Sequence, residues 1–358
     1  MRHLQKLCCA LLLLVFVAAY GDSAPEGIEA PVGIATKTVT DQAQPPQFRV
    51  IDDVHRLLEG GTLDFTRQQI GEVDYILSGR LFPNVEGYLD VNYRSRDFDA
   101  EVEEAFAAIH PPIAGTGARL GAMLAPFGIV NQLQPHQFPF ADNPTVIKNL
   151  LGDEFSGDGY EVLYTDPRGE LHARLGQWTT RHEDGADPRL GAGFTDSFVL
   201  FHGSLSQARL ADERTEAPGL KLGASWGYGP GEGTNLSLMG ADLFWKKNLK
   251  NGRNFRLQME GIRRRRQQAR PGYQHEFGYY VMGIYQPAEN LEVGARYDWS
   301  EVPYLFRTHE TALSLFGTRH LGESNYLRLQ LKRGMTPEKV AYNEVLVQLV
   351  YRFDGPVK

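Results

Sequence analysis

The feature that most constrains this chain is a regular alternation of apolar and polar residues near its C-terminus. In the segment from Asn343 to Phe353, one face is apolar or aromatic, while Glu344, Gln348 and Arg352 lie on the other. A period of two is typical of a β-strand with one apolar face and one wet face. Phe353 stands where a strand of an outer-membrane barrel carries an interfacial aromatic residue. A strand of a soluble β-sandwich has the same pattern, so the interpretation depends on how often the pattern recurs.

The alternation recurs along most of the chain from Val73 onward. Residues 291–299 read L-E-V-G-A-R-Y-D-W, and residues 327–332 read L-R-L-Q-L-K. A soluble core tolerates few inward Arg, Asp or Lys residues, whereas almost every one of these segments has one. A water-filled lumen inside a lipid-facing barrel explains both faces at once. The sequence therefore predicts an all-β protein, a transmembrane antiparallel up-and-down β-barrel.

The N-terminus has the pattern of a secretory signal peptide over residues 1–21. A charged start with Arg2 and Lys6 precedes the apolar run 7–17 and small residues suited to cleavage. Both cysteines lie in this segment, so the mature chain would have no disulfide and no thiolate metal site. The loss of Arg2 and Lys6 takes the formal charge from -7 to -9. This acidic balance gives no electrostatic reason to expect a nucleic-acid partner.

The rest of the chain divides into three parts. Residues 22–70 are predicted to be a flexible periplasmic leader that contains a possible first strand. Residues 71–354 are predicted to form the barrel, and residues 355–358 a short tail. About fifteen strand candidates follow Val73, and single-chain bacterial barrels usually have an even number, so we expect sixteen strands, with fourteen as the alternative. About 50 mature residues precede the first clear strand, which is too few for a plug domain.

The connections between strand candidates alternate between short and long. Residues 166–169, 250–252 and 286–290 are predicted to be tight turns, and longer polar stretches occupy residues 127–157, 179–193, 228–233, 267–273 and 301–308. Short turns on one side and long loops on the other are typical of outer-membrane barrels. Residues 127–157 form the longest interruption and are rich in Pro and Phe, so we expect them to pack in the lumen as a constriction loop. An ordered cap over the rim is the alternative. The residues expected at the constriction are His136, Phe138, Phe140 and Asp142.

The alternation also predicts which charged side chains line the lumen. Their modest basic excess suggests a preference for anions, and mutual ion pairing is the alternative. A second basic group, the run Arg263, Arg264, Arg265 and Arg266, is expected near the outer surface, where it could bind lipopolysaccharide phosphates. Two of the four should face outward and two inward, and a solvated rim with no specific partner is the alternative. The expected lumen-lining residues are Arg119, Arg174, Lys221, Arg256, Glu260, Arg296, Asp298, Arg328 and Lys332.

Four stretches resemble a known family. Residues 125–144 read A-P-F-G-I-V-N-Q-L-Q-P-H-Q-F-P-F-A-D-N-P, and F-G-Y-Y-V-M (277–282), G-A-R-Y-D-W-S-E (294–301) and E-T-A-L-S-L-F (310–316) follow. They resemble a family of plugless porin-like outer-membrane proteins of Gram-negative bacteria, which is distantly like phosphate-selective porins and often labelled zinc-regulated TonB-dependent receptor. Family members often carry a second His near the one matching His136, whereas Leu133 and Gln134 stand here. The resemblance implies a barrel over residues 71–353.

The expected function is a porin-like outer-membrane channel for passive or weakly selective transport of small solutes, with anions or metal-related solutes as candidates. A closed barrel whose extracellular loops bind a ligand or partner is the alternative. A barrel enzyme is disfavoured because the sequence has neither a G-x-S-x-G elbow nor a clear third catalytic partner. The scattered histidines show no metal-ligand spacing, so no metal site and no cofactor are expected. The expected partners are the outer membrane, lipopolysaccharide, small solutes and the barrel-assembly machinery.

Overall fold

A computed structural model describes most of the chain after the leader. The described residues are 47–48, 53–59, 62–63, 72–94, 99–180, 193–206, 219–231, 234–267, 273–303, 308–322, 325–351 and 355–356. The signal peptide and most of residues 22–70 lie outside this part of the chain. Within it, no helix is long and apolar enough to cross a membrane.

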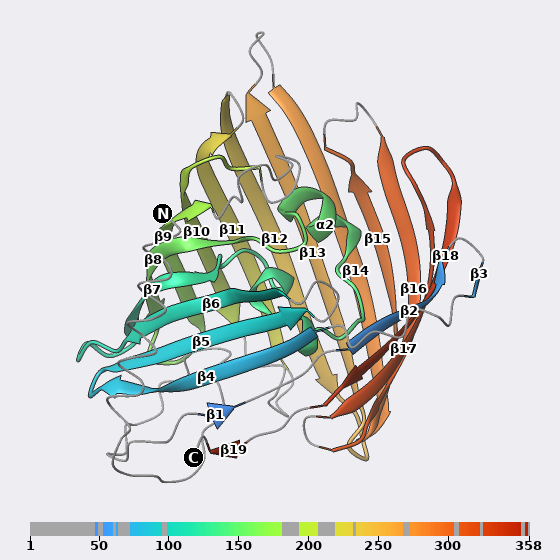
Figure 1. The fold of residues 1–358 in the computed structure, drawn as a ribbon, viewed down its shortest axis with the longest axis horizontal. Helices are drawn as coiled ribbons and strands as arrows, with labels where there is room; N and C mark the ends of the chain where they lie inside the picture. The colour runs from blue at the N-terminus through green and yellow to red at the C-terminus, as the bar shows by residue number, and fades with distance from the viewer. Residues whose placement is uncertain are drawn as a thin grey trace.

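Fifteen consecutive strands, β4 to β18, form one sheet in which each strand is antiparallel to the next (Figure 1). This order is the up-and-down topology expected from the sequence. The strands are β4 (Glu72–Phe82), β5 (Val85–Arg94), β6 (Asp99–Ile109), β7 (Thr116–Leu124), β8 (Ser156–Thr165), β9 (Leu171–Thr180), β10 (Ser197–Ser206), β11 (Gly219–Gly231), β12 (Thr234–Asn248), β13 (Asn254–Gln267), β14 (Tyr273–Ala288), β15 (Leu291–Glu301), β16 (His309–His320), β17 (Tyr326–Met335) and β18 (Ala341–Val350).

Short strands from both ends of the chain continue this arrangement. The strand β2 (Asp53–Glu59) is antiparallel to β18, with His55 paired to Val347, and β3 (Thr62–Leu63) pairs with β2. The segment 53–59 lies in the part of the chain where the sequence allows a first strand, and its role as a barrel strand stays a prediction. The last long strand, β18, is described as far as Val350, and Phe353, the expected interfacial aromatic residue, lies outside the described residues. Farther on, β19 (Gly355–Pro356) pairs with β1 (Gln47–Phe48) in a separate two-stranded sheet.

The two faces of the large sheet are reversed relative to a soluble protein. In β17, Leu329 is 48% exposed on the outer face, whereas its neighbours Arg328 and Gln330 are 3% and 0% exposed. The same alternation of exposed and buried residues runs through β10 to β12. Because alternate side chains of a strand point to opposite faces, the apolar set faces outward and the charged set faces inward.

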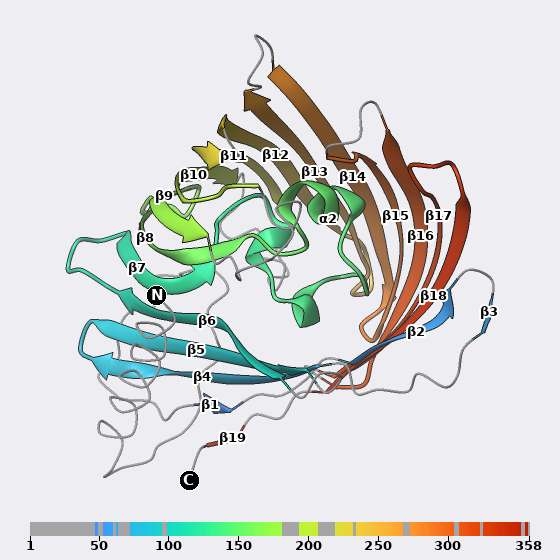
Figure 2. The same cartoon turned by 45° about the horizontal axis from the view of Figure 1, so that its top comes forward.

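Residues 125–155, which we call the inner loop, connect β7 to β8 and lie within the curve of the sheet (Figure 2). They contain the 3-10 helices η1 (Val130–Gln132) and η2 (Pro135–Gln137) and the helix α2 (Thr145–Leu151). Asn131 joins the two ends of the loop: its Nδ2 donates to the carbonyl oxygens of Ala125 and Phe155 at 2.8 Å, and its Oδ1 accepts from the Phe155 N–H. The loop is thus a folded unit with its own internal hydrogen bonds.

The inner loop packs against the inner face of the sheet through apolar side chains. Phe155 stacks on Phe198 with ring centroids 4.9 Å apart, and Phe198 stacks on Phe194 and Trp178. Phe127 and Phe140 are fully buried in the same cluster, which extends to residues of β13, β14 and β16. Burial of these side chains releases water from apolar surface, so the packing favours a loop docked on the wall over one extended into solvent.

Most of one connection predicted to be a long loop belongs to a strand, and residues 232–233 lie outside the described residues. Residues 228–233 were expected to form a polar loop, but β11 runs to Gly231 and β12 begins at Thr234. The glycines in this stretch leave room for inward aromatic rings: a Cβ at Gly229 would lie 2.7 Å from the Cβ of Phe198. The prediction failed because glycine and proline in this segment mark close packing against the strand, not a turn.

Candidate functional site

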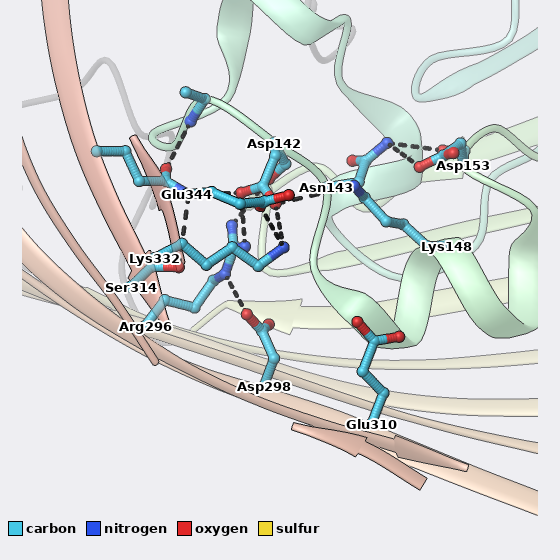
Figure 3. Close-up of polar contacts among 12 residues, drawn as sticks. Asp142, Asn143, Lys148, Asp153, Arg296, Asp298, Glu310, Ser314, Lys332 and Glu344 are labelled. Atoms are coloured by element: carbon cyan, nitrogen blue, oxygen red, sulfur yellow. Dashed lines mark hydrogen bonds and ion pairs between the residues drawn. The ribbon is translucent and has the colours of Figure 1, made fainter. Parts of the chain in front are cut away.

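The contact between Asp142 of the inner loop and the wall of the sheet is the most highly charged site described (Figure 3). Arg296 Nη2 of β15 lies 2.8 Å from Asp142 Oδ1, and Lys332 Nζ of β17 lies 2.7 Å from Asp142 Oδ2. Gln330 Nε2 donates to Oδ1 at 2.6 Å. Lys148 of α2 is farther away, with its Nζ 3.8 Å from Oδ2. Both carboxylate oxygens are therefore held, mainly by groups from the wall.

The strand pattern explains why these groups converge. Gln330 and Lys332 are two residues apart in β17 and so share its inner face, while Arg296 faces inward from β15. Each is also held by a second group. Arg296 Nε donates to Asp298 Oδ2 at 2.9 Å, and Lys332 Nζ lies 3.5 Å from a carboxylate oxygen of Glu344. Asp298 and Glu344, which belong to the wall, therefore hold the two cations in place independently of the loop carboxylate.

The charges around Asp142 set its protonation state. Burial by itself would raise the pKa of this carboxyl, but Arg296 and Lys332 outweigh burial and hold the pKa of Asp142 well below its usual range. Asp142 is therefore ionised at neutral pH. Its main-chain oxygen also accepts a hydrogen bond from Arg296 Nη1 at 2.9 Å. The guanidinium therefore binds both the side chain and the main chain of Asp142.

Neighbouring residues of the loop attach to the same part of the wall. Arg328 Nη1 donates to the carbonyl oxygen of Phe140 at 2.9 Å, and the Phe140 ring lies under the Arg296 guanidinium, 4.3 Å from its carbon. The hydroxyl of Tyr326 donates to the carbonyl oxygen of His136 at 2.8 Å. The segment from His136 to Asp142 therefore runs along β15 and β17.

A second attachment lies on β13. Glu260 Oε2 accepts the main-chain N–H groups of Ile129 and Val130 at 3.2 and 3.3 Å. These N–H groups stand at the start of η1, where they have no partner within the helix. The Tyr280 hydroxyl donates to the same oxygen at 3.3 Å. Gly128, with φ of 62°, allows the loop to approach, because a Cβ there would lie 1.6 Å from Glu260 Oε1.

A third attachment joins the loop to β6 and β9 on another part of the wall. Arg174 Nη1 donates to Gln132 Oε1 at 2.6 Å and also contacts Glu161, which Arg119 binds as well. The carboxylate of Glu104 accepts from the Leu124 N–H and from Gln134 Nε2, each at 2.9 Å. Attachments on β6, β9, β13, β15 and β17 hold the loop across the interior.

The constriction residues expected from the sequence all belong to the docked segment, although their parts differ. Asp142 binds the wall through its side chain, and Phe138 and Phe140 are buried, with ring centroids 5.3 Å apart. His136 contributes its main-chain oxygen. A role for these four residues in narrowing a pore remains a prediction.

The nine side chains expected to line the lumen all belong to the inner face, but they form separate groups. Arg296, Asp298 and Lys332 meet at Asp142, with Arg328 beside them. Arg119 and Arg174 meet at Glu161, Glu260 binds η1, and Arg256 pairs with Glu292 at 2.7 Å. Lys221 lies on β11 and belongs to none of these groups. Ion pairing between inward charges, the alternative to a free basic excess, is thus extensive.

The arginine run divides between the two faces of β13. Arg263 and Arg265 are exposed, and Arg263 Nη2 lies 3.2 Å from His275 Nδ1. Arg264 and Arg266 face inward, where both bind Glu276, at 3.2 and 2.6 Å. Two of the four arginines thus face outward and two inward, as the alternation predicts, because neighbours in a strand point to opposite sides. Binding of lipopolysaccharide by the outward pair stays a prediction.

Two residues that make contacts within these groups were not predicted as site residues from the sequence. Gln330 holds Asp142 and accepts the Ala141 N–H at 2.9 Å, and Glu161 joins Arg119 to Arg174. The alternation already placed Gln330 between two inward cations, which was the available signal. Among the described residues, no three His, Cys, Asp or Glu side chains gather where they could hold a metal ion.

Comparisons with known proteins identify the fold. No family model and no curated protein matches the chain. Solved structures do match at low identity. The anion-selective porin from Comamonas acidovorans is 12% identical, with a TM-score of 0.57 over 87% of this chain and 98% of that one. OprB of Pseudomonas putida is 10% identical, with a TM-score of 0.58 over 87% and 94% of the two chains.

The outer membrane channel DcaP of Acinetobacter baumannii is similar to the same extent. It is 11% identical, with a TM-score of 0.56 over 89% of this chain and 100% of that one. The fold of this chain is thus the fold of the outer-membrane porins, along almost their whole length. The comparisons do not confirm the zinc-regulated receptor label attached to the family that the sequence resembles.

Proposed function

We propose that this chain is a porin-like channel of a bacterial outer membrane and that its inner loop narrows the path for small solutes. The observation that carries the proposal is the reversal of the two faces, with exposed apolar and buried polar side chains alternating along β10 to β12 and β17. An apolar outer surface can contact the lipid of a membrane, and a charged inner surface can contact the water of a lumen. The likeness to porins supports the same architecture. Diffusion through the lumen requires no catalytic group.

In this proposal β2 is the sixteenth strand and closes the sheet between β18 and β4. Its antiparallel pairing with β18 supports this, as does the even number of strands usual in single-chain bacterial barrels. Closure also removes the two open edges that a curved sheet would otherwise expose to lipid.

We further propose that the channel is weakly selective. The inward cations near the loop are mostly paired: Arg296 and Lys332 with Asp142, and Arg174 with Glu161. Paired charges attract a passing ion less than free charges do, so a strong preference for anions is not expected. The solutes would be small and polar, and the docked loop would limit their size.

The proposal also gives the barrel an orientation. The inner loop and the connection after β13 leave the sheet at the same end, as successive upward strands require, and long loops are extracellular in bacterial barrels. The exposed Arg263 and Arg265 would then lie near lipopolysaccharide phosphates, which suit guanidinium groups. Insertion would depend on the barrel-assembly machinery. A closed barrel with ligand-binding loops is the competing hypothesis.

Two measurements test the proposal. The mature protein should fractionate with outer membranes and migrate differently on a gel when unheated. In planar bilayers it should give discrete conductance steps, with a small reversal potential in a gradient of potassium chloride. Recovery of a folded protein in the soluble periplasm would refute the membrane location. A correctly inserted barrel without conductance would favour the closed alternative.

A further inference from the structure

The groups that hold Asp142 have the composition of a carboxylate-binding site. Arg296, Gln330 and Lys332 belong to two strands of the wall, and none of the three side chains belongs to the loop. Together they place three donors on the two carboxylate oxygens, at 2.6 to 2.8 Å. Arginine and lysine donors at these distances make charge-assisted hydrogen bonds, which are the strong class. The wall therefore presents a receptor, and the loop supplies the anion.

The receptor is buried and held in shape by its own partners. The side chains of Arg296 and Lys332 are 0% and 5% exposed, and Gln330 is fully buried. Asp298 orients Arg296 through its Nε, and Ser314 lies 3.4 Å from Gln330 Nε2. Preorganised donors lose little freedom when an anion binds, so the arrangement would serve a free carboxylate as well as Asp142.

The ion pairs centred on Asp142 balance in charge. Asp142 is ion-paired with three cations, Arg296, Lys332 and Lys148, and the first two are also paired with Asp298 and Glu344. These are three cations and three carboxylates. Without the Asp142 carboxylate, the group would carry one excess positive charge in a buried site, which is unfavourable unless another anion enters.

We infer that Arg296, Gln330 and Lys332 form a carboxylate-binding site on the channel wall, which Asp142 occupies as an internal ligand, so that a solute carboxylate and the docked loop exclude one another there. The inference extends the proposed function, on which it rests for the supply of solute. Asp142 is tethered close to the site and so has a high effective concentration. A free carboxylate therefore binds only where the loop has been released or its carboxylate removed.

Chemical rescue tests the site directly. Asp142→Ala removes a carboxylate group, and formate is a carboxylate small enough to take its place. The probe is sodium formate added to the full-length refolded protein in detergent, with sodium chloride at equal ionic strength as the control. The readout is hydrogen exchange of the amides in residues 138–148. In Asp142→Ala, formate should slow this exchange about tenfold relative to chloride, equal to about 1.4 kcal/mol, whereas the wild-type protein should not respond.

Two further variants show which groups act. Asp142→Ala combined with Lys332→Met should lose the response to formate, because one oxygen then has no cationic donor from the wall. Asp153→Asn removes another carboxylate of the same loop, which receives a hydrogen bond from Asn143, and should behave like the wild type. If formate protects Asp142→Ala no better than chloride in a correctly assembled barrel, the inference is wrong. Equal protection in the double variant would also overturn it.

Conductance separates this inference from the proposed function. In planar bilayers, formate should reduce the chloride current through Asp142→Ala and leave the wild-type current unchanged. A protein that never conducts but shows formate protection by hydrogen exchange would refute the channel and retain the site. A conducting Asp142→Ala protein that shows no response to formate in either assay would refute the site and retain the channel.

Discussion

Arg296 binds Asp142 at two different atoms, with Nη2 on the side-chain carboxylate at 2.8 Å and Nη1 on the main-chain oxygen at 2.9 Å. A bidentate guanidinium contact fixes orientation as well as position. It therefore determines where the backbone of the inner loop lies, and loss of the Asp142 charge should release that backbone.

Asp142→Asn should lower the free energy of opening the inner loop by about 3 kcal/mol, because removing one charge of a buried pair leaves Arg296 and Lys332 uncompensated. Hydrogen exchange of the loop amides at pH 7 measures this. The matched control is Asp153→Asn in the same loop, for which little change is expected. Similar exchange in all three proteins would contradict the anchoring role of Asp142.

The same contact predicts a pH dependence with a definite sign. The pKa of Asp142 is well below its usual range in the folded protein, whereas an aspartate in the unfolded chain has a pKa of about 3.9. Its contribution is therefore complete above about pH 5 and is lost as the pH falls below about 4, through the folded pKa. The difference in opening free energy between wild type and Asp142→Asn should be constant from pH 5 to 8 and shrink at lower pH. A difference that grows on acidification would show that the assigned charge state is wrong.

The two faces of the sheet predict opposite tolerance of neighbouring substitutions. Leu222 is 46% exposed on the outer face of β11, and Lys221 lies on the inner face. Leu222→Arg should destabilise the inserted barrel by about 2–4 kcal/mol if the site lies near the bilayer midplane. Lys221→Gln should be tolerated. The fraction of protein that migrates as the folded form on an unheated gel measures both, and equal damage would mean that the faces have been assigned wrongly.

Gly128 offers a test of the attachment to β13. Gly128→Ala would place a methyl group 1.6 Å from Glu260 Oε1 and force this carboxylate away from η1, in addition to the strain of a φ of 62°. Gly169→Ala is the control, because φ there is 71° but no atom lies within 4 Å of the new methyl group. The difference between the two variants in loop-amide exchange isolates the contact. Gly128→Ala should open the loop more readily than Gly169→Ala; an effect no larger than that of Gly169→Ala would mean that the contact with Glu260 does not hold the loop.

Much of this fold can be predicted from the sequence, because the alternation of apolar and polar residues is a local signal. The pattern around Leu329 assigns each neighbour to a face without knowledge of other strands, and the exposures agree with that assignment. Strand ends are less predictable. Gly229 and Gly231 resemble turn residues in sequence, yet they continue β11, where Phe194 and Phe198 pack against Gly229. That packing depends on residues more than thirty positions earlier in the chain.

The contacts between residues of the site could not be predicted from the sequence, for a related reason. The sequence predicted that Asp142 lies in the long loop and that Arg296 lies on the inner face of a strand. Their meeting depends on the path of the loop through the interior, which the burial of Phe140 and the position of α2 determine. Pairing over 154 residues has no local signature, so the sequence supplied the members of the site but not the contacts between them.

The inner loop should control conductance if it lies in the path of solutes. Deletion of residues 134–143 removes Phe138, Phe140 and Asp142, and with them the attachments to β15 and β17. The barrel should still assemble, because fourteen strand-to-strand pairings from β4 to β18 do not involve the loop. We expect a higher single-channel conductance than in the wild type, measured in potassium chloride, with the folded form retained on unheated gels. Asp153→Asn, which leaves these attachments intact, should keep the wild-type conductance. An assembled deletion variant with unchanged conductance would mean that the loop covers part of the wall and that the narrowest point lies elsewhere.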